Sequence, residues 1–156
     1  MTPFTDHCLL LVVEDSPAAL TAARYTTELA RLTGAPIRAV SVVSDGVLAD
    51  AMAEASGRPD VRGRRDLAVR SMLRHVERLA GPAEVPLETV LLSGDTAEQV
   101  LDEARRVRPE MIVLGRDEIP QPGGPVLVPW AARILEFAEQ PVLVVPAGWR
   151  AGGERP

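Results

Sequence analysis

Two short segments of this sequence hold side chains that could bind a phosphate or a cation. Residues 12–17 read V-V-E-D-S-P, which places two carboxylates and a hydroxyl directly after an apolar run. A second segment begins with G-R-D-E at Gly115. Carboxylates are good ligands for Mg²⁺, whereas glycine backbone N–H groups and helix starts favour phosphate. The chemistry to test is therefore phosphoryl or nucleotide binding.

The paired acids Glu14 and Asp15 resemble the opening of a phosphorelay receiver domain, which holds Mg²⁺ with such a pair. A receiver also needs a phosphoacceptor Asp after the third strand and a Lys after the fifth. Here the third strand is followed by Ser93 and Gly94, and Asp95 stands in a helix-capping position. All 17 basic residues are Arg. The receiver pattern therefore fails, and a P-loop is excluded because it too needs Lys.

Other catalytic patterns are missing. The turn after residues 8–13 lacks the G-x-G-x-x-G of a dinucleotide-binding fold, and no G-x-S-x-G elbow occurs. His7 and His75 are expected on the surface, away from the acidic segments. A single cysteine, Cys8, rules out an internal disulfide and a cysteine zinc site, and we expect it in the core. We therefore expect no enzyme activity and no resident cofactor or metal.

Composition limits the partners. The chain has 156 residues, 46% of them hydrophobic, and a net charge of -5. An acidic chain lacks the basic surface that nucleic acids or anionic membranes need. Its apolar stretches are far shorter than the ~20 residues of a membrane-spanning helix, and no basic segment precedes the first one, as a signal peptide requires. We expect a soluble, cytoplasmic protein with no membrane insertion.

Apolar runs alternate with stretches of helical spacing along the chain. We expect strands at residues 8–13, 36–43, 87–92, 111–114 and 141–145, and helices at residues 18–32, 69–80, 97–107 and 130–138. Between them we expect loops at 44–65, with a short helical piece around 47–55, and at 116–129. The pattern predicts a doubly wound α/β domain over residues 1–148 with a disordered tail at 149–156. We expect its single five-stranded parallel sheet to have the order 3-2-1-4-5, with helices on both faces.

In such a sheet, ligands bind beyond the carboxyl ends of the strands, where the strand order reverses. That point lies between the first and fourth strands. It brings Glu14 and Asp15 toward the loop that begins after Gly115. The two acidic segments therefore belong to one predicted site.

The ordered set of motifs over residues 8–146 resembles the universal stress protein family. The resemblance rests on the first strand with Ser16, on V-L-L-S-G-D from residue 90, on M-I-V-L-G from residue 111, and on P-V-L-V-V from residue 141. Nucleotide-binding members carry Asp, then Gly, after the first strand. After the fourth strand they carry G-x-x-G, nine further residues, and then Gly with Ser or Thr.

This chain keeps the spacing of that motif and changes its residues. Gly115 matches the first glycine, but Glu118 and Val128 stand at the other two. Pro129 replaces the hydroxyl residue and lacks an N–H. The family's usual Arg aligns with Asp117, and Glu14 and Asp15 replace Asp and Gly. The resemblance thus implies a degenerate nucleotide pocket formed by Glu14, Asp15, Ser16, Val43, Leu114, Gly115, Arg116, Asp117, Glu118, Val128 and Pro129.

Four carboxylates, those of Glu14, Asp15, Asp117 and Glu118, would converge where a triphosphate should lie. A like-charge contact near 4 Å costs about 4 kcal/mol at an effective dielectric constant of ~20, and Arg116 alone does not offset several. We therefore predict weak or absent ATP binding, which Mg²⁺ could partly restore. Three interpretations stay open: a solvated acidic rim, a cation site of Glu14, Asp15 and Asp117, or a retained nucleotide.

The last strand, with Val142, Leu143, Val144 and Val145, is expected at the sheet edge. Unpaired edge groups favour pairing with a second chain, and the resemblance implies a homodimer through this strand. The alternative is an edge covered by the tail. Arg58, Arg62, Arg64 and Arg65 form either a solvated loop or a docking surface for an acidic partner.

The resulting expectation is a non-catalytic stress-response or regulatory dimer that acts on an unknown partner protein. A nucleotide sensor for ATP or AMP is the main alternative. A slow nucleotide hydrolase is a third, but this sequence offers it no obvious base.

Overall fold

The computed structural model describes residues 4–43, 55, 57, 61–118, 122–124 and 126–152, and for 61–65 the backbone alone. Five strands form one parallel sheet in the order β3-β2-β1-β4-β5. The strands are β1 (Leu9–Val12), β2 (Ile37–Val43), β3 (Leu87–Ser93), β4 (Met111–Arg116) and β5 (Val142–Pro146), and the helices are α1 (Pro17–Thr33), α3 (Val61–Ala80), α4 (Thr96–Val107) and α5 (Pro129–Phe137). The predicted fold class and strand order are confirmed.

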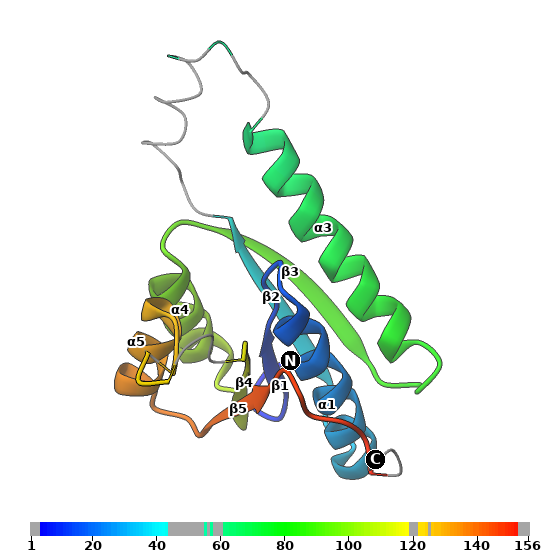
Figure 1. The fold of residues 1–156 in the computed structure, drawn as a ribbon. Coiled ribbons are helices and arrows are strands. Elements are labelled where there is room, and N and C mark those ends of the chain that lie inside the picture. Colours follow the sequence, from blue (N-terminus) through cyan, green and yellow to red (C-terminus); the bar gives the residue numbers. More distant parts are fainter. Residues whose placement is uncertain are drawn as a thin grey trace.

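Helices α1 and α3 cover one face of the sheet, and α4 and α5 cover the other (Figure 1). The central strand β1 shows how the sequence builds both layers. Its Leu9 and Leu11 belong to the core under α1 and α3, and its Leu10 and Val12 belong to the core under α4 and α5. Burial on both faces explains why this strand is a continuous apolar run without alternation.

The helix ends follow local sequence signals. Ser16 caps α1, Pro17 occupies its first turn, and Gly34 closes it with a φ of 74°. Asp95 caps α4 by accepting a hydrogen bond from the Glu98 N–H at 2.9 Å. The predicted capping position of Asp95 is therefore confirmed.

Two predicted boundaries are wrong. The loop expected to reach residue 65 ends earlier, because α3 already begins at Val61. Arginines are good helix formers and offset the single glycine in that first turn. Strand β4 continues through Gly115 to Arg116, because its backbone pairs with β5 as far as Pro146. The helical piece expected around 47–55 falls mostly outside the described residues.

A buried ionic network links the sheet to α4. Arg38 on β2 is 7% exposed and Glu103 on α4 is 6% exposed. Arg38 donates to Glu103 at 2.6 Å and also to Glu88 on β3, and Arg106 donates to Glu103 at 2.6 Å. None of the sequence patterns described above predicts this network.

Cys8 is buried, as predicted, and burial raises the pKa of its thiol to about 11. This thiol is therefore protonated and unreactive at neutral pH.

The chain after β5 turns back along α1. The Ala147 carbonyl accepts a hydrogen bond from the Thr21 hydroxyl at 3.2 Å, and the Trp149 ring meets the Tyr25 ring edge-on with centroids 5.0 Å apart. The division into a domain and a disordered tail at residue 149 stays a prediction. None of the helices in the described part of the chain is long and apolar enough to cross a membrane.

Candidate functional site: the carboxyl ends of β1 and β4

The end of β1 is held by its neighbours in the sheet. Val13 donates its N–H to the Val40 carbonyl at 2.8 Å, and its own carbonyl accepts a hydrogen bond from the Ser41 hydroxyl. The chain then turns, because the Ser16 N–H donates to the Glu14 carbonyl at 2.9 Å. This turn places Glu14 and Asp15 at the carboxyl end of β1, where the sequence predicted them.

Ser16 is already engaged by its own chain. Its hydroxyl oxygen accepts from the Ala19 N–H at 3.2 Å, and the hydroxyl donates to Glu14 Oε1 at 3.3 Å. The side chain therefore caps α1 and orients a carboxylate. A phosphate bound here would have to compete with both hydrogen bonds.

Glu14 and Asp117 are the two acids that the fold brings together. Glu14 is half-buried, and the pKa of its carboxyl is raised, first by burial and second by the negative charge of Asp117, against the opposing hydrogen bond from Ser16. Asp15, Asp117 and Glu118 are exposed. The electrostatic repulsion expected between the two acidic segments thus acts between Glu14 and Asp117.

Gly115 is required by packing. A Cβ atom added to this residue would lie 2.4 Å from the Ala18 carbonyl oxygen and 2.9 Å from the Ala19 nitrogen. Both atoms are backbone of α1, so the glycine allows α1 to approach β4 closely. The sequence motif accounts for this glycine by phosphate binding alone, and its close packing against α1 is a second and sufficient reason.

The other predicted site residues take mainly structural positions. Leu114 is fully buried, the Val43 carbonyl accepts from the Gly94 N–H at 3.0 Å, and the Arg116 carbonyl accepts from the Ala147 N–H at 2.8 Å. Val128 precedes α5 without a side-chain capping bond, and Pro129 is its first residue. Residues 119–121 and 125 of the intervening loop lie outside the described residues.

Among the described residues, no group of three or more His, Cys, Asp or Glu side chains could hold a metal ion. The alternative cation site of Glu14, Asp15 and Asp117 is thus not assembled as such a group. His7 lies at the far end of the sheet and hydrogen-bonds Glu110 at 3.1 Å.

Comparison with known proteins gives the family of the chain. The family model described as the universal stress protein family matches residues 8–146. No curated protein matches the chain. Since the family model spans most of its length, the chain belongs to the universal stress protein family.

Solved structures share the fold at low identity. A universal stress protein from Archaeoglobus fulgidus is 20% identical, with a TM-score of 0.69 over 89% of this chain and 98% of that one. The universal stress protein from Archaeoglobus fulgidus in complex with dAMP is 19% identical, with a TM-score of 0.67 over 89% of this chain and 97% of that one. A universal stress protein in complex with cAMP is 16% identical, with a TM-score of 0.64 over 92% of this chain and 98% of that one. At these identities the likeness shows the fold alone.

Proposed function

We propose that this chain is a non-catalytic regulatory or stress-response protein that works as a cytoplasmic homodimer through a partner protein, with weak or absent ATP binding. Family membership supports the general class. One observation carries the finer proposal: burial, and second the negative charge of Asp117, raise the pKa of Glu14 at the carboxyl ends of the strands, where a nucleotide phosphate would lie. An anion entering this site meets two carboxylates that already repel each other.

Titration of the protein with ATP, with and without Mg²⁺, is expected to give little or no binding heat in a calorimeter. Removing both charges with Glu14→Gln and Asp117→Asn is expected to tighten nucleotide binding at least about tenfold. Each carboxylate repels the phosphates of the nucleotide, and the repulsion stays substantial even when it is partly screened by salt. A matched control is Glu136→Gln with Glu139→Gln, which removes the same charge from exposed positions on and after α5. A wild-type dissociation constant in the low micromolar range would overturn the proposal.

The pH dependence gives a second readout of the same charges. Because the folded-state pKa of Glu14 is raised, this carboxyl takes up a proton at a higher pH than an ordinary Glu. As the pH falls toward that pKa, the repulsion weakens, and wild type and Glu14→Gln are expected to converge in nucleotide affinity. A difference that stays constant across this range would mean that Glu14 does not act through its charge.

A nucleotide-sensing module is the second candidate function. It is favoured by the solved structures of universal stress proteins with dAMP and cAMP. Mass spectrometry of material released by denaturing the freshly purified protein separates the two candidates. A co-purified nucleotide supports the sensor, and its absence supports the proposed partner-binding protein.

Dimer formation through β5 is supported by the free side of that strand. Strand β5 is the last in the sheet, and the described part of the tail lies along α1 instead of over β5. The Pro141 carbonyl accepts a hydrogen bond from the Ile112 N–H, and the Ala147 N–H donates to the Arg116 carbonyl, so the odd-numbered positions of this segment face β4. Val142 and Val144 lie at the alternate positions, and their backbone N–H and C=O groups therefore point away from β4. Val145 is 2% exposed, so its side chain already belongs to its own core.

Replacing Val144 by Pro is expected to convert the dimer into a monomer in light-scattering measurements. The substitution removes an outward N–H and spares the hydrogen bonds to β4, and an edge strand accepts proline at such a position. Val144→Thr keeps the N–H and the branched shape and should stay dimeric. A wild type that is monomeric at all concentrations, or a Val144→Pro variant that is still dimeric, would contradict pairing through β5.

A further inference from the structure

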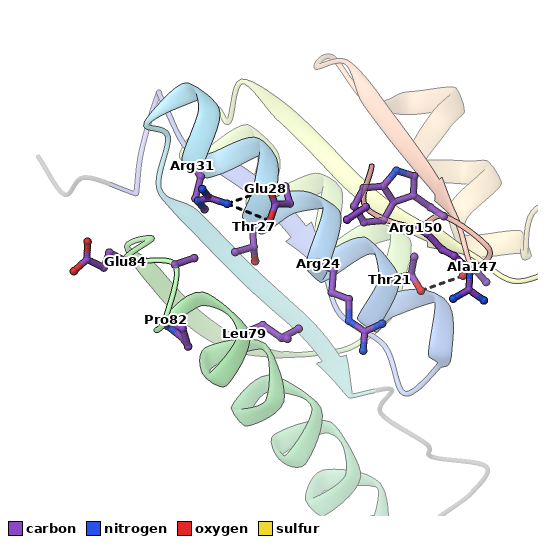
Figure 2. Close-up of a pocket in the computed structure, with 13 residues that line it drawn as sticks. Thr21, Arg24, Thr27, Glu28, Arg31, Leu79, Pro82, Glu84, Ala147 and Arg150 are labelled. Carbon is purple, nitrogen blue, oxygen red and sulfur yellow. Dashed lines mark hydrogen bonds and ion pairs between the residues drawn. The ribbon is translucent and has the colours of Figure 1, made fainter. Parts of the chain in front are cut away.

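A groove of about 940 Å³ runs along the outer face of α1. Figure 2 shows its three components, which lie far apart in the sequence. Helix α1 forms the floor from Thr21 to Arg31, the end of α3 and the following turn supply one wall, and the chain after β5 supplies the other. None of the predicted nucleotide-pocket residues lines this groove, so it is separate from the acidic site.

Ala147 and Trp149 of the C-terminal wall are held by contacts with neighbouring residues. Thr21 is 7% exposed and its hydroxyl donates to the Ala147 carbonyl, the Trp149 N–H donates to the Pro146 carbonyl at 3.0 Å, and the Trp149 ring packs on Tyr25. A groove that exists before binding requires little ordering of the protein when a ligand enters.

The end of the groove near Thr21 is cationic. Arg24 and Arg150 lie on either side of Thr21 in Figure 2, and neither makes an ion pair with any residue in the described part of the chain. Arg31 differs, because it pairs with Glu28 at 3.2 Å. Because no carboxylate in the described ranges pairs with Arg24 or Arg150, both guanidinium groups can pair with a ligand. Their planar donor groups match carboxylates well.

The shape of the groove favours an extended polypeptide. Thr21 and Arg31 are ten residues apart on one helix, a rise of about 15 Å, and this length accommodates about four residues of extended chain. Leu79, Pro82 and Trp149 on the walls offer apolar contacts. Glu84 lies on the wall opposite the C-terminal segment and disfavours acidic groups beside it.

We propose that this groove docks an extended acidic segment of a partner protein. Its carboxylates pair with Arg24 and Arg150, and an apolar side chain of the segment packs between the walls. The inference rests on the proposed function, since it gives the chemistry of the partner through which the protein acts.

Fluorescence anisotropy with a fluorescein-labelled hexapeptide of Glu and Leu tests the proposal. We expect the peptide to bind, its affinity to fall with added salt, and a matched peptide of Lys and Leu not to bind. Replacing Arg24 and Arg150 by Gln should weaken binding at least about tenfold, as expected for the loss of charge-assisted contacts. The control pair, Arg105→Gln with Arg133→Gln, removes the same charge from the opposite face of the sheet and should leave the affinity unchanged. Circular dichroism checks that all variants are folded.

Equal affinity of the Arg24 and Arg150 variant and wild type would overturn the proposal. So would displacement of the peptide by pyrophosphate at concentrations as low as the peptide's own dissociation constant, because the site would then be a small-anion site. These outcomes are independent of the nucleotide titration, which reports only on the edge of β1 and β4. A failed docking test with weak ATP binding would therefore leave the proposed function standing.

Discussion

Replacing Arg38 by Met is expected to lower the free energy of unfolding by about 3–5 kcal/mol, as when one partner of a buried ion pair is removed. The Arg38 side chain is 9% exposed, and it bonds Glu103, whose side chain is 7% exposed. Without Arg38, Glu103 keeps only Arg106, and the charge stays buried against the sheet. Urea unfolding monitored by circular dichroism measures the loss.

Two variants decide whether the charge causes this effect. Arg38→Met combined with Glu103→Leu removes both buried charges and should recover most of the stability, because Glu88 and Arg106 both reach solvent. Arg105→Met breaks the exposed pair with Asp102 on the same helix and should cost at most about 0.5 kcal/mol. A double variant as unstable as Arg38→Met would show that packing, and not the unpaired charge, is responsible.

The network also predicts how stability depends on pH. Burial opposes ionisation of Glu103, but the hydrogen bonds from Arg106 and Arg38 outweigh it and lower the pKa of this carboxyl. A lowered folded-state pKa gives stability that is present above the ordinary pKa of Glu and is lost as the pH falls through the folded value. The advantage of wild type over Arg38→Met should therefore shrink in acid.

Replacing Gly115 by Ala is expected to cost about 3 kcal/mol, at the upper end of the range for overpacking. The added Cβ would lie 2.4 Å from the Ala18 oxygen and 2.5 Å from its carbonyl carbon, and neither atom can rotate away as a side chain could. Helix α1 or strand β4 must shift to make room. In a thermal melt this cost corresponds to a Tm lower by about 6–12 °C.

Gly148→Ala is the matched control, since it lies on the chain just after β5. A Cβ there would meet only Glu118 Oε1, at 3.8 Å, which is ordinary contact. This variant should unfold within about 0.5 kcal/mol of wild type, as surface substitutions usually do. If Gly115→Ala were equally harmless, the close approach of α1 to β4 would not be the reason for the glycine.

The sequence was sufficient for the fold because its signals are local and repeated. The run from Cys8 to Val13 can be buried on both faces only in a parallel sheet covered by helices. Ser16, Pro17 and Gly34 bound α1 through their own backbone preferences. The parallel order of the strands also predicted that Glu14 and Asp117 lie close together, because the carboxyl ends of neighbouring parallel strands lie side by side.

The tertiary structure alone decided the contacts between residues far apart in the chain. No spacing rule pairs Arg38 with Glu103, although an arginine inside an apolar strand was a signal that could have been followed. Nothing near Arg150 in the sequence indicates that it lines the same groove as Arg24, because the path of the chain after β5 depends on Thr21 and Tyr25 of α1. Backbone preference and hydrophobic periodicity act over a few residues, whereas burial of charge and the shape of a groove depend on which surfaces meet after folding.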